Sequence, residues 1–316
     1  MMFTNATIFV FPAVISAALR EMLVVDRDGD ALQLALAEHV VKPVGPMELS
    51  SVGFASPYGE DNKALYQRVS TDDIDVITLT IASEQRVLPS GAVNKALMDK
   101  IRKFEADNAR KPGGKMRRQM KDDLVSEMLP KAFVQPGRTD LYIDLRRHMV
   151  IINTASRKAA EAAVSQIREV LGSFPALPVN CEVAPRQILT GWVAGEDMPD
   201  EWSLGDECEL RDPADSGAVV KVQRMELAGT EIDSHLEAGK QVKRLGLLHS
   251  DLISAVLDEE MVLRKVKLMD VVLDRHEEEE RDDINAFLDG KLLLMAGALG
   301  PFIDSASKAF KWTRAE

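Results

Sequence analysis

The chain has 316 residues and a formal net charge of −12, with 46% hydrophobic and 28% charged residues. This composition excludes wholesale disorder, and the length leaves room for two or three domains. Two cysteines, Cys181 and Cys208, are too few for a disulfide framework and fit a reducing cytoplasm. Residues 1–19 are apolar, but they lack the basic region of a signal peptide and the long apolar run of a membrane span.

The first 88 residues are predicted to mix short strands with one helix. The β-branched, apolar runs TIFVF (7–11) and DVITLTIA (75–82) have the length of strands. Between them, DALQLALAEHVV (30–41) repeats its apolar residues at helical spacing.

A long amphipathic helix is predicted next, with Pro89 and Ser90 at its start and Ser90 as the N-cap. One face is apolar and carries Val93, Leu97, Ile101 and Phe104. The opposite face is cationic, and its members are Lys95, Arg102, Lys103 and Arg110.

The sequence Pro112-Gly113-Gly114 is expected to end this helix, because proline and glycine disfavour helical continuation. A second helix follows, and its apolar stripe consists of Met116, Met120, Leu124 and Met128. Lys115 and Arg118 point away from the stripe, Lys121 lies near its edge, and Arg117 falls within it. LPKAF (129–133) is expected to end this helix.

The two helices concentrate positive charge. Residues 100–121, KIRKFEADNARKPGGKMRRQMK, contain nine Lys or Arg and two acids, a balance of +7 that leaves −19 for the other residues. A negative net charge argues against nucleic acid as a partner. This argument fails where the positive charge is concentrated in one segment, as it is here.

The remaining residues predict an α+β protein with mixed antiparallel sheets and long amphipathic helices. A hairpin is expected over 141–152 with its turn near Arg146 and Arg147, followed by a helix capped by Ser156 and ended by Gly172. From 186 on, a second region with its own strands is expected, including 207–212, 218–227 and a hairpin that turns at 258–260. Residues 287–312 would add a last strand and a helix. The predicted parts are an N-terminal α+β part (1–88), the basic helix pair (89–133), a hairpin-helix part (134–178), a protruding finger-like region (179–260) and a C-terminal strand-helix part (261–316).

Enzymatic motifs are absent from the sequence, which has no Walker A run, no dinucleotide-binding glycine motif and no zinc-protease or serine-hydrolase signature. The acidic run DRHEEEERDD (274–283) is the one exception, because clustered carboxylates can hold Mg²⁺ for phosphodiester cleavage. A solvated acidic loop is the favoured interpretation, since adjacent residues do not share one face of a helix or strand. No catalytic residue, metal or cofactor is predicted.

The cationic helices have two interpretations. Lys and Arg on an outer helix face often serve only solubility, but such faces usually interleave Glu with Lys at i, i+4. This face is barely interrupted by acids, so we expect it to bind a phosphate backbone. No base-reading motif is present and aromatic residues make up only 5% of the chain, which favours duplex DNA bound without sequence preference over single strands.

Several blocks together resemble the recombination-associated RdgC family of bacterial nucleoid-associated proteins: LPSGAVNKALMDKI, ARKPGGKMRRQMKDDLVSEMLPKAF, ILTGWV and SHLEAGKQVKRLGLL. The strongest stretch runs from Leu88 to Phe133. The resemblance implies a protein that dimerises into a closed ring around duplex DNA, in the cytoplasm at the nucleoid. It also implies a role in restraining RecA-dependent recombination and in supporting replication.

By position, the resemblance places Phe133 at a dimer contact, with a core aromatic at a helix end as the alternative. It places Lys221, Arg224 and Lys240 in a protruding finger that approaches DNA. Met225 departs from the family pattern, where a polar residue is expected, and KPGG replaces a more basic run.

The predicted DNA-binding set is therefore Lys95, Arg102, Lys103, Arg110, Lys111, Lys115, Arg117, Arg118, Lys121, Lys221, Arg224 and Lys240. A non-enzymatic duplex-binding ring is the preferred hypothesis. A protein inhibitor that meets a recombinase through its acidic surface is the second, and a metal-dependent nuclease built on the acidic run is the third.

Overall fold

A computed structural model describes residues 2–24, 30–214, 217–269 and 284–313. The chain separates into two compact units. The main unit consists of Met1–Ala37, Ser56–Thr80 and Thr139–Glu316. The helix-pair unit consists of Glu38–Ala55 and Ile81–Arg138. The five-part division drawn from the sequence stays a prediction.

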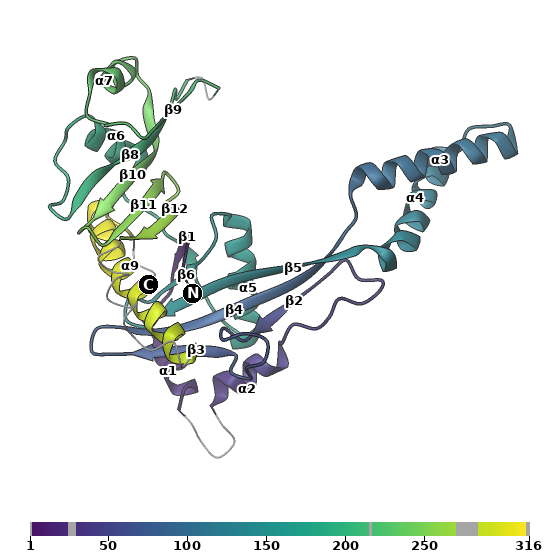
Figure 1. The fold of residues 1–316 in the computed structure, drawn as a ribbon, viewed down its shortest axis with the longest axis horizontal. Coiled ribbons are helices and arrows are strands. Elements are labelled where there is room, and N and C mark those ends of the chain that lie inside the picture. Colours follow the sequence, from purple (N-terminus) through teal and green to yellow (C-terminus); the bar gives the residue numbers. More distant parts are fainter. Residues whose placement is uncertain (1, 25–29, 215–216, 270–283, 314–316) are drawn as a thin grey trace. The chain divides into compact units, whose positions relative to one another are not determined.

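The main unit is built on a large, mainly antiparallel sheet (Figure 1). Its strand order is β4-β5-β6-β1-β12-β11-β10-β8-β9, with β3 beside β4 and β7 beside β1. The strands are β1 (Asn5–Val10), β3 (Tyr66–Ser70), β4 (Asp75–Val87), β5 (Phe133–Asp144), β6 (Met149–Ile152), β7 (Leu177–Pro178), β8 (Trp202–Arg211), β9 (Val219–Gln223), β10 (Gln241–His249), β11 (Ile253–Asp258) and β12 (Leu263–Leu268). The strands β4 and β5 continue into the helix-pair unit.

Six of the eight α-helices in the described residues belong to the main unit. They are α1 (Ala13–Met22), α2 (Ala31–Glu38), α5 (Arg157–Leu171), α6 (Pro185–Val193), α7 (Thr230–Glu237) and α9 (Ile284–Ala309). By length and a mean hydropathy of 1.5, α9 could span a membrane. However, Leu299, Phe302 and Ile303 are buried with residues of β10 and β11 in one hydrophobic core, so this side of α9 packs against the sheet.

The helix-pair unit contains β2 (Ser50–Ala55), the second part of β4, α3 (Ser90–Asn108), α4 (Gly114–Met128), the short 3₁₀ helix η1 (Leu129–Lys131) and the first part of β5. Arg86 of β4 holds the segments before and after the helices, because its guanidinium donates to the carbonyl oxygens of Gly45 at 3.1 Å and Ala132 at 3.3 Å. Gly53 lets β2 approach residues 39–41 closely, since a Cβ there would lie 2.5 Å from the backbone nitrogen of Val41.

Several elements are confirmed: the predicted strands β1 and β4, the hairpin of β5 and β6, and the hairpin of β11 and β12. Ser156 caps α5 by accepting the backbone N–H of Ala159 at 3.3 Å, and Gly172 ends the helix with φ of 70°.

Two predictions of secondary structure are wrong, and one helix was not predicted. The first 88 residues contain two helices, because α1 begins directly after Pro12, whose fixed φ suits a helix start. The element that was not predicted is α6, with which the region from 186 on opens, and its first residue is Pro185. Residues 287–312 hold no strand; their apolar run is part of α9, and periodicity alone does not separate a buried strand from a buried helix.

The ends of the predicted helix pair also differ from expectation. Ser90 is the first residue of α3, so Pro89 and not Ser90 takes the N-cap position. That helix ends at Asn108 instead of at the proline, because Ala109 takes a left-handed conformation with φ of 52°. Arg110 therefore lies in the connection between the helices and not on the cationic face of α3. Gly114 belongs to α4, with Gly113 at its N-cap position.

Candidate nucleic-acid interface

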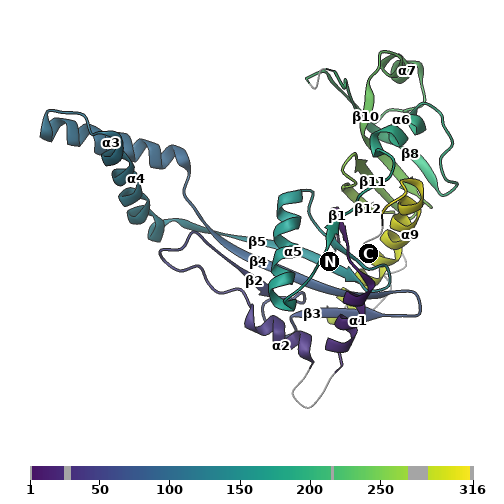
Figure 2. The same ribbon diagram turned by 180° about the vertical axis from the view of Figure 1, so that it is seen from behind.

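The helix pair α3 and α4 is the part of the chain with the densest positive charge. The two helices lie side by side and run in opposite directions (Figures 1 and 2). Val93 of α3, with Met120 and Leu124 of α4, are buried. Leu97, Ile101 and Phe104 are half-buried, so the predicted apolar face of α3 does turn inward. Met116 is 45% exposed, so the stripe of α4 begins one turn later than predicted.

All nine predicted DNA-binding residues of the helix pair are exposed. They come from α3 (Lys95, Arg102, Lys103), from the connection (Arg110, Lys111) and from α4 (Lys115, Arg117, Arg118, Lys121). The spacing predicts that Arg117 falls within the apolar stripe, yet it too is exposed.

Almost none of these nine cations is neutralised by another residue that the structure describes. In the described residues, only Arg102 has an ion-pair partner, Asp99, at 3.7 Å, and both side chains are exposed. Such a surface pair contributes little to stability. The other eight guanidinium and ammonium groups form no ion pair with a described residue, so their charge is available to an external anion.

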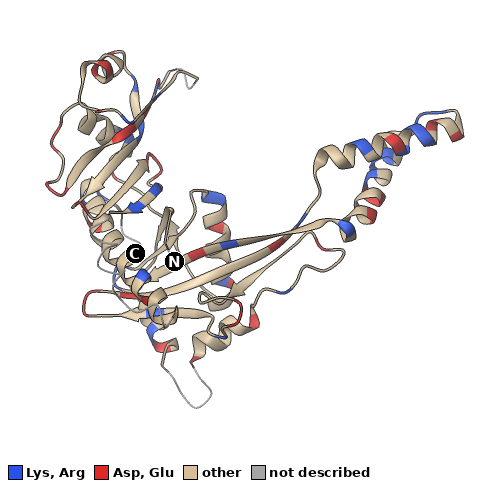
Figure 3. Ribbon diagram, in the orientation of Figure 1, with Lys and Arg blue, Asp and Glu red and all other residues tan. Residues whose placement is uncertain are grey.

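Acids accompany the cations along the pair without pairing with most of them (Figure 3). Asp122, Asp123 and Glu127 fall in the second half of α4, and Gln119 donates to the Asp123 carboxylate at 2.8 Å. The cationic segment 100–121 thus ends where the acids of α4 begin. It forms a bounded cationic surface, which we call the helix-pair surface.

The remaining three candidates lie in the main unit. Lys221 is on β9, Arg224 follows that strand, and Lys240 comes between α7 and β10. Lys221 and Arg224 are exposed, whereas Lys240 is half-buried. Met225 is also exposed, at 36%. The structure therefore brings Lys221 and Arg224 to the surface of one strand and its continuation.

A cluster around Glu209 of β8 contains two cations that sequence reasoning missed. Glu209 is buried, and its carboxylate accepts hydrogen bonds from Arg211 at 3.0 Å and Arg244 at 3.1 Å. Lys221 lies 3.9 Å from the same carboxylate. Three cations around one carboxylate leave a local excess of positive charge, which we call the Glu209 cluster.

The signal for the Glu209 cluster lies in the strand pairing. Lys221 and Arg244 are the register partners of Glu209 on the two neighbouring strands, β9 and β10. Cross-strand partners share a face of the sheet. Because side chains alternate along a strand, the sequence predicts which charges of one strand share a face. It does not predict which residues of the neighbouring strands lie opposite them, because contacts between the strands set the register.

Phe133 is the most exposed of the large apolar side chains that the structure describes, at 88%. It begins β5 directly after η1 and Ala132. The alternative interpretation of Phe133 as a core aromatic is therefore wrong for the single chain. An exposed phenylalanine on a strand is the type of residue that interfaces bury.

The acidic run 274–283 lies outside the described residues, as does His276 within it. Among the residues that are described, no group of three or more His, Cys, Asp or Glu side chains is placed to hold a metal ion. The two cysteines are unpaired, and burial raises the pKa of Cys208 to about 12, so its thiol stays protonated at neutral pH.

The fold and these surfaces define an α+β protein with exposed polycationic surface on a helix pair and on an antiparallel sheet. The chain belongs to the RdgC family, whose sequence model, described as "Putative exonuclease, RdgC", matches residues 1–313. The resemblance drawn from the sequence motifs is thereby confirmed.

Relatives extend over the full length of the chain. The "Recombination-associated protein RdgC" of Xanthomonas campestris pv. campestris is 45% identical over 317 residues and covers all of both chains. The proteins of the same name from Xanthomonas oryzae pv. oryzae and Stenotrophomonas maltophilia are 44% and 42% identical, again over the whole of both chains. These relatives are named for recombination and not as enzymes, whereas the family description mentions an exonuclease.

Proposed function

We propose that this chain is a non-enzymatic, sequence-independent binder of double-stranded DNA that acts as a ring-shaped homodimer. In the cytoplasm, at the nucleoid, it would encircle duplex DNA, restrain RecA-dependent recombination and support replication. The names of its relatives support a role in recombination. The binding mode and the ring are our inference.

The observation that carries the proposal is the helix-pair surface. Nine exposed cations lie on two adjacent helices and their connection, and only Arg102 is ion-paired to a described residue. Unpaired Lys and Arg release counterions from a phosphate backbone when they bind it, which gives affinity without reading the base sequence. The excess charge of the Glu209 cluster supplies a second surface of the same kind.

The charge distribution also supports a ring. With +7 in residues 100–121 and −19 elsewhere, most of the chain repels DNA. A cationic lumen inside a net-negative assembly would admit duplex only along the hole. Phe133, which is 88% exposed, is our candidate for a residue that the dimer buries.

Duplex binding measured over a range of salt concentrations tests the proposal. Two unrelated duplexes of equal length should bind with similar affinity, and log K should fall with log salt at a slope of about −0.9 per phosphate neutralised. Light scattering on the same sample should give a dimer rather than a particle of 34.9 kDa. A salt-independent affinity, or a monomer at micromolar concentration, would contradict the proposal.

The two alternatives have their own outcomes. Cleavage of linear duplex by the pure protein in Mg²⁺, lost when Glu277 to Glu280 are changed to Gln, would establish a nuclease of the kind that the family description names. Binding to a recombinase without DNA, with no affinity for duplex alone, would establish a protein inhibitor. Neither result is expected from an exposed cationic helix pair.

A further inference from the structure

A pocket of about 640 Å³ lies in the main unit, away from the residues used in the proposed duplex binding. Its wall combines the start of α1, the turn after β5 and the last turns of α9. Phe11 and Met149 line its apolar part, and Arg146, Arg147 and Lys308 line its cationic part. The volume is in the range of pockets that take small ligands, about 300–1,000 Å³.

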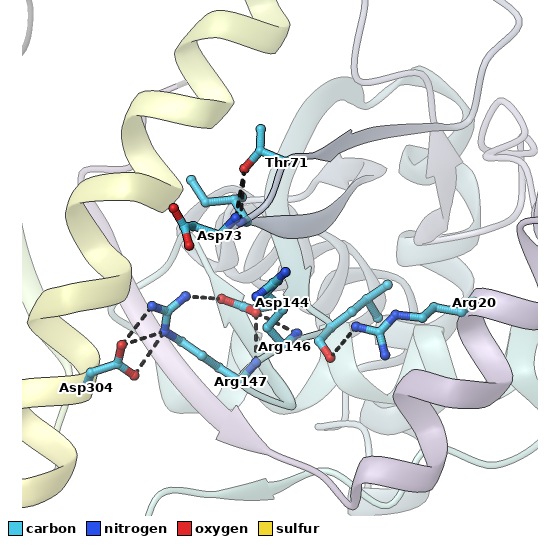
Figure 4. A network of polar contacts seen from close by, with 9 residues as sticks. Arg20, Thr71, Asp73, Asp144, Arg146, Arg147 and Asp304 are labelled. Carbon is cyan, nitrogen blue, oxygen red and sulfur yellow. Dashed lines mark hydrogen bonds and ion pairs between the residues drawn. The ribbon is translucent and has the colours of Figure 1, made fainter.

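The turn after β5 is held rigidly by one buried carboxylate (Figure 4). Asp144 accepts the backbone N–H groups of Arg146 and Arg147, each at 2.9 Å. The Arg147 guanidinium donates to Asp144 at 3.0 Å and to Asp304 of α9 at 2.7 Å. The turn and the end of α9 are therefore tied together, and the pocket between them is preformed.

Two cations in the pocket wall have no ion-pair partner among the described residues. The charge of Arg147 is matched by Asp144 and Asp304. Arg146 and Lys308 are exposed, and neither forms an ion pair with another described residue. Burial and the nearby Arg20 lower the pKa of the fourth basic residue, His148, so that its imidazole is neutral at pH 7.

A third donor in the pocket wall also lacks a partner. The indole Nε1 of Trp312 is buried and has no hydrogen-bond acceptor among the described residues. A buried donor without an acceptor costs about 1–3 kcal/mol, so such groups commonly bind water or a ligand. In addition, α1 begins at Ala13 in the same wall, where the positive end of a helix dipole favours an anion.

We propose that this pocket binds a phosphate group, and that its size suits a phosphate carried by a mononucleotide. Arg146 and Lys308 would form charge-assisted hydrogen bonds to the phosphate oxygens. The volume of about 640 Å³ exceeds what inorganic phosphate fills, and the half-buried side chains of Met149 and Trp312 offer apolar surface to a flat base. The unpaired cations would select an anion, and Met149 and Trp312 would select one that carries a flat apolar group.

Isothermal titration calorimetry of the full chain with inorganic phosphate and with adenosine monophosphate tests this site. The double variant R146A/K308A should bind both ligands at least tenfold more weakly, because it loses two charge-assisted contacts. Both side chains are exposed, so the variant should keep its thermal midpoint. The matched control is K158A, which removes an exposed lysine of α5 outside the pocket and should leave both affinities unchanged.

Duplex binding by the same variants identifies the source of the phosphate. If the small anions bind and R146A/K308A loses them while duplex affinity stays at the K158A level, the ligand is a free nucleotide. If neither small anion binds but the double variant binds duplex more weakly than K158A, the phosphate belongs to the DNA backbone. The proposal is overturned if small anions bind equally to wild type and double variant. It is also overturned if nothing small binds and the two variants have equal duplex affinity.

Discussion

The two units use the same residue types in opposite ways. In the main unit, Arg and Asp or Glu side chains are paired and partly buried: Asp75 with Arg20 and Arg68, Asp144 with Arg147, Glu209 with Arg211 and Arg244, and Asp258 with Arg264. The side chains of these four acids are at most 9% exposed. In the helix-pair unit, the cations of α3 and α4 are exposed and mostly unpaired.

The buried ion pairs contribute to the stability of the fold, whereas the exposed, unpaired cations are available to bind a ligand. A buried carboxylate that loses its arginine is strongly destabilising, so arginines in such pairs are bound to the fold. An exposed lysine without a partner contributes little to folding and can be used in binding. Even within the helix-pair unit, Arg86 follows the first rule, because its guanidinium is used on backbone carbonyls.

The largest expected effect concerns the buried charge. Asp144→Ala should lower the free energy of unfolding by about 3–5 kcal/mol, because it leaves two backbone N–H groups of the turn without their acceptor and removes one of the two carboxylates that pair with the half-buried Arg147. Urea unfolding followed by circular dichroism measures it. The matched control is Asp99→Ala, which breaks the exposed pair with Arg102 and should cost less than about 0.5 kcal/mol. Equal costs for the two variants would abolish the distinction between the units.

The second prediction concerns exposed charge, where duplex affinity should change and stability should not. Changing Arg110, Lys111, Lys115 and Arg118 together to Ala should leave urea unfolding within about 0.5 kcal/mol of wild type, because all four are exposed. Duplex affinity should fall about 10²–10³-fold near physiological salt, and the slope of log K against log salt should shrink by about 3.6, if each cation neutralises one phosphate.

The control for that variant is a second set of four exposed cations from the main unit, Lys63, Arg157, Lys158 and Lys311, changed together to Ala. It has the same change in net charge and should reduce duplex affinity much less. If both quadruple variants lose affinity equally, binding follows the total charge of the chain, and the helix-pair surface has no special role.

Much of this contrast could be predicted from the sequence. The i, i+4 spacing of Val93, Leu97 and Ile101 predicts an amphipathic helix, and the lack of interleaved acids predicts that its cations lie unpaired. The end of α3 was not predictable in this way. The left-handed residue is Ala109 and not a glycine, so the sequence pattern extends the helix too far and includes Arg110 in it.

The Glu209 cluster and the nucleotide pocket could not be predicted, for a different reason. Glu209 meets Lys221 and Arg244 only through the register of three strands, and Arg147 meets Asp304 across 157 residues of sequence. Neither contact leaves a short-range pattern, because tertiary packing alone sets it. The long apolar run of α9 does leave a short-range pattern, but that pattern fits a strand and a buried helix equally well.

A smaller effect is expected at Phe133. Phe133→Ser should weaken dimerisation by about 1.5–3 kcal/mol, the value of burying one large apolar side chain, if the dimer covers it. Sedimentation velocity at several protein concentrations measures the change. The free energy of unfolding of the monomer should stay the same, because the side chain is already 88% exposed.

The control, Val14→Ser, changes an apolar side chain of the main unit that is 68% exposed and should not alter the dimer. An unchanged oligomeric state in Phe133→Ser would remove Phe133 from the interface. It would also leave the helix-pair unit with charge as its main functional feature.

The smallest expected effect concerns the acid side of the stability curve, where the main unit should respond through His249. This imidazole is 2% exposed, stacks edge-on against Trp202 at 5.3 Å, and its Nδ1 has no partner among the described residues. Burial lowers the pKa of His249, against a smaller opposing effect of Glu201. Below the ordinary pKa of about 6.5, the unfolded chain therefore binds a proton at His249 more readily than the folded chain does. The free energy of unfolding is therefore highest above that pH and falls as the pH drops below it.

Urea unfolding at pH 7.5 and pH 5.5 should show a larger loss for wild type than for His249→Phe, which stays neutral and keeps the contact with Trp202. Carboxylates and His148 titrate in both proteins, so their contributions cancel in the difference. Duplex affinity corrected for the folded fraction should change equally in both proteins, because His249 belongs to the core and not to the helix-pair surface. A pH dependence of stability that is identical in the two proteins would show that His249 is protonated in the folded core as readily as in water.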